Sequence, residues 1–421
     1  MAGASPPDHP ARVAAEQAAR ASYGKLVAIL ASRSRDLAAA EDALAGAFAK
    51  ALETWPAGGV PKSPEAWLLT AARRTMLNAH RHDRVRDAAA PEVARRYDER
   101  LGEIESVQDG MAALPDERLK LLFVCAHPAI DPAARTPLML QTVLGLDAAR
   151  IGAAFLVAPA TMGQRLVRAK VKIRDAGIHF DVPGIEVLPD RLGDVLDAIY
   201  AAFGAGWDAS AESGETIRGL PEEAIYLARL LASLLPDEPE TMGLLSLMLF
   251  VHARRRARRD AAGSFVPLGR QDVSLWDRDA IIEAEGRLTA ASRHGRFGRF
   301  QCEAAIQSVH AQRAVTGRLN LDALETLYGL LARHHPSIGA LVAWAAVLHE
   351  RGDPAAALAR LDAITPVPEG YQPYWVLRAH CLRELGDVAG ARLATEEAIT
   401  LTPDAAVRTY LLGTFAPLGL M

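Results

Sequence analysis

Cysteine is scarce in this sequence: Cys125, Cys302 and Cys381 are the only three among 421 residues. They lie far apart, their number is odd, and no CxxC spacing occurs. Disulfide frameworks and zinc sites need paired or clustered cysteines, so this pattern argues against both. His127 lies close to Cys125, but no further metal ligand follows. We interpret the two as a core cysteine and a loop histidine, and we expect no metal and no other cofactor.

Long apolar runs are also missing. The longest, "MGLLSLMLFV" at 242–251, has roughly half the length that a bilayer-spanning helix needs. The N-terminal stretch "MAGASPPDHPARVAAEQ" lacks the apolar core of a signal peptide. We therefore expect a cytoplasmic protein with no membrane partner.

Strand patterns are the third absence. Aromatic residues make up 6% of the chain, and the β-branched residues form no alternating runs of the kind that mark strands. Ala, Leu, Arg and Glu, which are good helix formers, are abundant. The sequence predicts an all-α fold, and its length predicts two or three domains.

The charge is uneven along the chain, although the net charge is only −4. Residues 1–180 hold 24 Lys and Arg against 20 Asp and Glu and so carry +4, whereas residues 181–421 hold 23 against 31 and carry −8. A mildly cationic front half with clustered arginines is compatible with nucleic-acid binding, and an acidic rear half with protein contacts.

Composition divides the chain into four segments. Residues 13–87 read as helices interrupted by a Pro/Gly loop at 55–64, and residues 88–112 read as a linker of mixed charge. Residues 113–180 form a second small helical unit, and residues 187–421 form a helical extension. The sequence thus predicts two small helical domains on a flexible linker, followed by a third, larger helical region.

A repeat marks the end of the extension. "AWAAVLHERGDPAAALARLDAI" superposes on "YWVLRAHCLRELGDVAGARLATEEAI" at a spacing of 34 residues, with Gly352 over Gly386 and Ala357 over Ala391. Gly317 marks a weaker, earlier copy. The spacing is that of the tetratricopeptide (TPR) hairpin, so we predict a TPR-like helical-repeat domain.

One strong basic run, "ARRRARR" at 253–259, interrupts the acidic half. We interpret it as a solvated helix end, with contact to DNA or to a protein as the alternative. Residues 261–277, which follow it, are irregular and have no assigned place in the helical array.

The stretch "LGLDAARIGAAFLVAPATMGQRLVRAKVKIRD" at 144–175 has helix–turn–helix dimensions. Asp147 is a candidate N-cap for the first helix, and Pro159 suits the first turn of the second. An apolar stripe at helical spacing faces the core: Met162, Leu166, Ala169 and Ile173. The residues predicted to face outward carry amide, hydroxyl and cationic groups suited to bases and phosphates: Thr161, Gln164, Arg165, Arg168, Lys170 and Lys172. The alternative is a solvated helix in an ordinary bundle.

A second basic helix is predicted at 66–86, where "AWLLTAARRTMLNAHRHDRVR" holds five arginines against one acid. Such a helix could hold a nucleic-acid strand, with unstacked bases near an aromatic ring. The candidate residues are Trp67, Arg73, Arg74, Asn78 and Arg81. A charged surface helix with a core tryptophan is the alternative. Upstream, "DLAAAEDALAGAFAKALETW" predicts an amphipathic helix with the packed stripe Leu37, Leu44, Phe48, Leu52 and Trp55.

Together these motifs resemble bacterial sigma factors of the extracytoplasmic-function (ECF) group over roughly residues 15–180. "LVAPATMGQRLVRAK" is similar to the second helix of that family's helix–turn–helix, with Thr161, Arg165 and Arg168 on matching positions. "LPDERLKLLFV" resembles the first helix of the same domain, "AEDALAGAF" the polymerase-binding helix, and "AWLLTAARRTMLNAHRHDRVR" the helix that opens the minus-ten element. With the repeat array, the chain resembles the ECF subgroup that has a TPR-like extension.

The resemblance implies that the protein binds core RNA polymerase and directs promoter-specific initiation, without catalysis of its own. The implied polymerase contacts are Glu41, Asp42 and Phe48. The implied minus-thirty-five contacts are Thr161, Gln164, Arg165, Arg168, Lys170 and Lys172. The implied minus-ten contacts are Trp67, Arg73, Arg74, Asn78 and Arg81. The extension is implied to regulate activity, with a possible intramolecular contact to the sigma domains.

The sequence departs from the family at three places. Ala45 and Gly46 replace a Gln and an acid that usually follow the Glu–Asp pair, Ala158 stands at a usual Ser or Thr cap, and residues 125–137 insert a proline-rich loop. A further hypothesis is that acids in the linker mimic nucleic acid near the polymerase active site: Asp98, Glu99, Glu103, Glu105 and Asp109. Two other classes stay open, a TPR scaffold or adaptor and a DNA-binding regulator that does not contact polymerase.

Overall fold

The computed structural model describes five stretches of the chain, which are residues 9–86, 117–155, 157–184, 187–207 and 219–416. Within them every regular element is a helix, and one isolated bridge between Arg259 and Phe265 is the β pairing present. The predicted all-α fold is confirmed. Across these stretches no helix has both the length and the apolar character that crossing a membrane requires.

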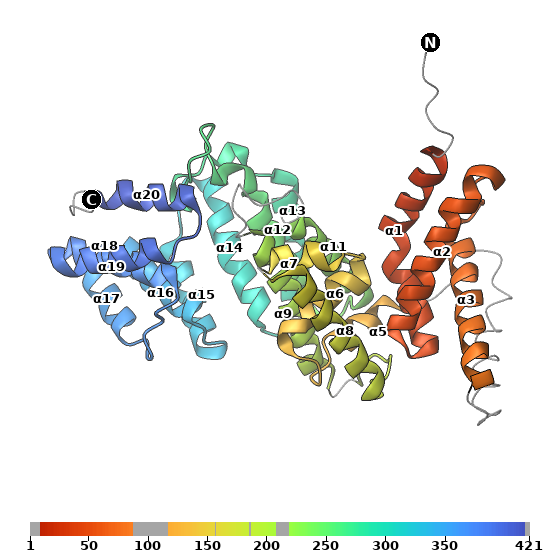
Figure 1. The fold of residues 1–421 in the computed structure, drawn as a ribbon. Coiled ribbons are helices and arrows are strands. Elements are labelled where there is room, and N and C mark those ends of the chain that lie inside the picture. The colour runs from red at the N-terminus through yellow and green to blue at the C-terminus, as the bar shows by residue number, and fades with distance from the viewer. Residues whose placement is uncertain (1–8, 87–116, 156, 185–186, 208–218, 417–421) are drawn as a thin grey trace, which may run out of the picture. The chain divides into compact units, whose positions relative to one another are not determined.

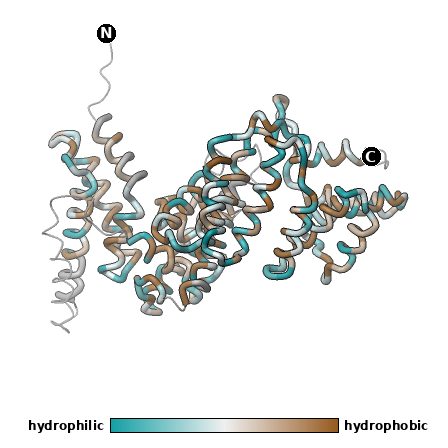
Figure 2. Tube along the Cα trace, turned by 180° about the vertical axis from the view of Figure 1, so that it is seen from behind, coloured by the Kyte–Doolittle hydropathy of each residue, from teal (hydrophilic) through white to brown (hydrophobic). Residues whose placement is uncertain are grey.

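The chain divides into two compact units. The first contains the described residues up to Trp207 together with residues 219–223, and the second contains the described residues from Ala224 onward. Hydrophilic and hydrophobic residues alternate along the helices of both units (Figure 2). Most helices therefore present one apolar side to their neighbours and one polar side to water.

Two groups of helices build the first unit (Figure 1). The first group contains three long helices: α1 (His9–Ser34), α2 (Leu37–Gly58) and α3 (Pro64–Arg86). The second group contains α5 (Arg118–Cys125), α6 (Pro132–Leu144), α7 (Ala148–Ala154), α8 (Pro159–Asp175) and α9 (Leu188–Trp207). The helix starts follow from local chemistry, since Asp36 and Asp131 accept backbone N–H groups at the starts of α2 and α6.

The two groups approach closely where α1 crosses α6. A Cβ atom on Gly24 would lie 2.2 Å from the backbone oxygen of Val143, so only glycine fits there. The residue before Gly24 also contacts α6: the ring of Tyr23 lies against Gly145, whose φ of 71° caps α6 in the left-handed conformation. The backbones of the two groups are therefore in direct contact.

The second unit contains α11 (Leu220–Leu234) for most of its length, and then α12 (Pro239–Ala253), α13 (Arg278–Ser292), α14 (Arg299–Thr316), α15 (Leu321–His334), α16 (Ile338–Glu350), α17 (Pro354–Asp362), α18 (Gln372–Glu384), α19 (Val388–Thr400) and α20 (Ala405–Phe415). Helix α12 is the most buried helix of its N-terminal part. Nearly all of its residues are buried between α13 and α14.

Two hairpins repeat the same local structure. In α16–α17 and α18–α19, Gly352 and Gly386 have φ of 83° and 85°, the left-handed turn that favours glycine. Asp353 and Asp387 follow, and each accepts the N–H three residues later to begin the next helix. The predicted 34-residue equivalence of these turns is therefore present in the fold.

The basic run at 253–259 differs from the prediction. Helix α12 ends at Ala253, and Arg254 is buried, donating a hydrogen bond of 2.6 Å to Gln307 Oε1 on α14. The interpretation of the run as a solvated helix end is wrong for Arg254, because the chain turns into a short 3-10 helix over Arg255–Arg258.

Residues 261–277 connect α12 to α13. They include two short 3-10 helices, Leu268–Arg270 and Val273–Leu275, and return to α12 where the N–H of Asp277 bonds the carbonyl of Ala253. Arg313 of α14 donates to the Leu268 carbonyl at 2.8 Å. This segment is therefore a packed connection between α12 and α13.

Candidate polymerase and promoter interface

The turn before α8 is built as its sequence predicts. Asp147 accepts the N–H of Arg150 at 2.8 Å to start α7, and Pro159 occupies the first turn of α8. The turn between them is tight because Gly152 carries no side chain: a Cβ there would lie 2.5 Å from the Val157 oxygen. The predicted stripe is confirmed, since the buried residues of α8 are Met162, Leu166, Ala169 and Ile173.

The opposite side of α8 carries polar and cationic groups. Thr161, Gln164, Arg168 and Lys172 are exposed, and Arg165 is half-buried with a 3.4 Å contact from Nη1 to the carbonyl of Ala133. These five are among the six residues expected to contact the minus-thirty-five element. They leave a continuous polar face that starts at the N-terminal turn of α8.

Lys170 is set apart from this face. Its Nζ pairs with the Oε2 of Glu41 on α2, and the two side chains are only 12% and 10% exposed. The pair joins a residue expected to bind DNA to a residue expected to bind polymerase. Local sequence patterns could not reveal it, because the partners are 129 residues apart.

On α2, the residues of the expected polymerase contact differ in exposure. Asp42 is exposed, Phe48 is half-buried, and Glu41 is buried. Burial raises the pKa of Glu41, while Lys170 acts in the opposite direction. The predicted packed stripe is wrong at Leu52, which is 48% exposed, because small residues, among them Ala47 and Ala51, make the close contact instead.

Helix α3 carries the expected minus-ten residues. Arg74 and Asn78 are exposed, and the half-buried Trp67 packs edge-to-face on Trp55 with ring centroids 5.5 Å apart. Arg73 is only 7% exposed. The sequence predicts Arg73 among the residues that hold a nucleic-acid strand, but it follows the buried Leu69 by four residues and so lies on the core side of α3. The Arg81 side chain lies outside the described residues.

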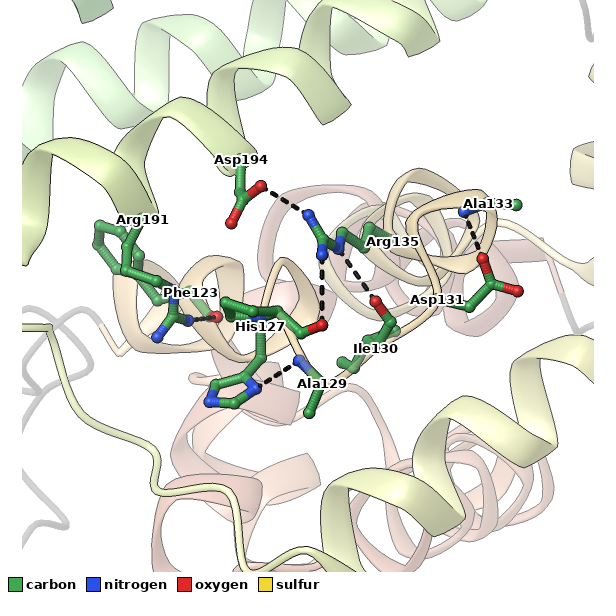
Figure 3. Close-up of polar contacts among 10 residues, drawn as sticks. Phe123, His127, Ala129, Ile130, Asp131, Ala133, Arg135, Arg191 and Asp194 are labelled. Carbon is green, nitrogen blue, oxygen red and sulfur yellow. Dashed lines mark hydrogen bonds and ion pairs between the residues drawn. The ribbon is translucent and has the colours of Figure 1, made fainter.

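The predicted loop at 125–137 is shorter in the structure, because Asp131 caps α6 and Pro132 begins it, so the connection covers residues 126–131. Helix α9 contacts the helices on both sides of this connection (Figure 3). Arg135 Nη1 donates to Asp194 Oδ1 of α9 at 2.6 Å, and Arg191 Nη2 of α9 donates to the Phe123 carbonyl at 2.6 Å. The same Arg135 side chain bonds the Ile130 carbonyl through Nε at 3.2 Å. Helix α9, which the sequence analysis assigned to the extension, therefore packs on α5 and α6.

Cys125 and His127 have separate local partners. Cys125 is fully buried, with Sγ 3.2 Å from Thr142 Oγ1, and burial raises the pKa of its thiol to about 12. His127 Nδ1 accepts the Ala129 N–H at 3.1 Å. In the described stretches no group of three or more potential metal ligands comes together.

The predicted linker, residues 88–112, falls entirely outside the described residues. Its acidic cluster, Asp98, Glu99, Glu103, Glu105 and Asp109, lies in the undescribed range 87–116. The hypothesis that these acids mimic nucleic acid stays a prediction.

Comparison with known proteins identifies two parts of the chain. Residues 19–86, which span α2, α3 and most of α1, match sigma-70 region 2. Residues 191–292 match a family of unknown function (DUF6596). An uncharacterized protein of Rhizobium meliloti is 38% identical over 378 residues, which cover 90% of this chain and 89% of that protein. No solved structure matches the chain.

Proposed function

Because the chain belongs to the same family as the uncharacterized Rhizobium meliloti protein and carries a sigma-70 region 2 domain, we propose that it is a sigma factor of the ECF type. It binds core RNA polymerase in the cytoplasm and directs initiation at particular promoters, and it is not itself an enzyme. The match at 19–86 supports the contacts to polymerase and to promoter DNA.

The observation that carries the promoter-reading part of the proposal is the polar face of α8. A helix after a tight turn, with a buried apolar stripe and an exposed N-terminal turn, has the form that enters a major groove. Gln164 and Arg165 can read base edges there, and Arg168 and Lys172 can bond phosphates. Thr161 lies at the N-terminal end of the same face.

The minus-ten and polymerase contacts are assigned to the first helical group. Exposed Arg74 and Asn78 on α3 suit an unstacked strand, with the edge of Trp67 nearby. Asp42 and Phe48 on α2 suit a polymerase surface. Glu41 completes this contact only when its pair with Lys170 is open.

The extension is proposed to regulate activity as a TPR-like domain. Two observations support this. First, the hairpins α16–α17 and α18–α19 repeat every 34 residues with left-handed glycines at Gly352 and Gly386. In addition, α9 lies where the match to the family of unknown function begins. It contacts α6 through Asp194, which pairs with Arg135, and α5 through Arg191, which donates to the Phe123 carbonyl.

The test is transcription with purified core polymerase on a genomic promoter library, comparing Arg165→Ala with wild type. Losing one base contact costs about 1–3 kcal/mol, or roughly 5- to 150-fold, in promoter-specific initiation. Polymerase binding should be retained. Arg174→Ala, which removes an exposed arginine from the far end of α8, is the matched control and should have little effect.

Other outcomes separate the remaining classes. Duplex binding by the protein alone, with no response to polymerase, would identify a DNA-binding regulator. A scaffold or adaptor would show neither DNA affinity that falls with salt nor promoter-dependent transcription. Equal loss of transcription and polymerase binding in Arg165→Ala would make Arg165 a structural residue.

A further inference from the structure

The pair Glu41–Lys170 links two surfaces that the proposed function needs separately. Glu41 belongs to the polymerase-binding helix α2, and Lys170 to the promoter-reading helix α8. While they pair, neither charge faces solvent. A bound polymerase and a bound promoter would each have to compete with this internal contact.

The surroundings of the pair are buried and poor in hydrogen bonds. Cys125 and Tyr23 lie near enough for the charge of Glu41 to act on both. The second carboxylate oxygen, Oε1, is buried and has no hydrogen-bond donor among the described residues. A buried carboxylate with an unsatisfied oxygen loses much of the free energy that its ion pair contributes.

A contact of this kind is specific but weak. The desolvation of two charges offsets most of their attraction, so the pair fixes which surfaces meet without holding them tightly. Water or a polymerase donor could satisfy Oε1 once the groups separate. The same cost does not arise for a purely apolar contact.

We propose that Glu41 and Lys170 form an internal latch that closes the α1–α3 group onto the α5–α8 group in the free protein and opens when polymerase binds. The role of the latch rests on the proposed function, whereas the ion pair is present in the structure whatever the function is. In the closed form, the buried ion pair removes Glu41 from the polymerase-binding surface and Lys170 from the DNA-binding surface. This prevents either surface from being fully available before the polymerase separates them.

The test measures the separation of the two groups without polymerase or DNA. Spin labels on cysteines introduced at Glu53 of α2 and Val167 of α8 report their distance, since both positions are exposed. The native cysteines are buried and will not compete for label. Wild type should give one narrow distance distribution.

Lys170→Met leaves the Glu41 charge buried and alone in the closed form. Removing one partner of a buried pair should raise the open population on the order of 100-fold, so the distribution should broaden toward longer distances. Lys172→Met, which removes an exposed charge from the same helix, should leave it narrow. The reversed pair Glu41→Lys/Lys170→Glu should restore the short distance.

Two results would overturn the latch: a wild-type distribution that is already broad, or a Lys170→Met distribution as narrow as wild type. Circular dichroism checks that the variant retains its helices. If it unfolds, Glu41→Gln, which removes the charge of the other partner and keeps the size of its side chain, takes its place, with an unchanged narrow distance again counting against the latch. Failure of the proposed function would appear separately, as absence of polymerase binding by every variant.

Discussion

The repeat hairpins and the α2–α8 contact are held together by different kinds of side chain. In the hairpins, Ala345, Ala357, Leu361 and Ala391 are 0% exposed and have wholly apolar side chains. Between α2 and α8 the buried centre is an ion pair. Apolar burial contributes a large, non-directional free energy, whereas a buried ion pair contributes little net stability and much selectivity. The first kind of contact suits a permanent scaffold, and the second suits a contact that opens.

Removing a core side chain from the repeat hairpins should destabilise the protein most. Leu361→Ala removes a fully buried side chain from the α16–α18 core and should lower the free energy of unfolding by about 2–5 kcal/mol. Leu393→Ala, at a position 61% exposed in α19, is the control and should stay within about 0.5 kcal/mol. Urea unfolding measures both, and equal effects would contradict the assigned core.

Acid should weaken the second unit selectively. Burial, aided by Arg254 and Arg313, lowers the pKa of His310 to about 4, and burial, aided by Arg383, lowers that of His380 to about 4. Unfolded histidine titrates near 6.5, so the unfolded chain binds more protons between pH 6.5 and 4. This stabilisation is complete above pH 6.5 and is lost as pH falls to 4, by up to about 3 kcal/mol for each histidine.

In the first unit, Glu41 should give the free energy of unfolding the opposite dependence on pH. Its pKa is raised, so its contribution is present at low pH and is lost as pH rises through the raised value. Hydrogen exchange resolved by mass spectrometry at pH 5 and 7, corrected for intrinsic rates, separates the two units. His310→Gln should reduce the acid sensitivity of the second unit. Equal acid sensitivity of both units would contradict the assignment.

Two glycine substitutions in the first unit should have smaller effects on stability. Gly24→Ala places a methyl group 2.2 Å from the Val143 carbonyl and should destabilise by about 1–3 kcal/mol. Gly46→Ala, in a helix with open space around it, should instead stabilise by about 0.5–1 kcal/mol. Thermal unfolding gives the two signs. Stabilisation by both substitutions would show that α1 and α6 do not pack closely in solution.

Features with a local period could be predicted from the sequence, and long-range contacts could not. The buried stripe of α8 follows from helical spacing, and the turns at Gly352 and Gly386 follow from the repeat. Arg73 is buried and Leu52 is exposed, against the prediction for each, because local sequence does not say which flank of a helix meets a neighbour. The sequence predicts Glu41 as a polymerase contact and Lys170 as a DNA contact, but only the fold brings the two together.

The pairing of α9 with α6 was also beyond local reasoning. Asp194 and Arg135 are 59 residues apart, and each reads alone as an ordinary surface charge. The sequence marks residues 125–137 as a departure from the family, but nothing local in them indicates that α9, where the region of unknown function begins, contacts α6.

The most direct measurement is gel filtration of the full chain with bacterial core RNA polymerase. The proposed function predicts that wild type co-migrates with the polymerase, and the latch predicts that Lys170→Met does so at lower concentrations. If neither wild type nor Lys170→Met co-migrates with core polymerase, the assignment as a sigma factor is contradicted.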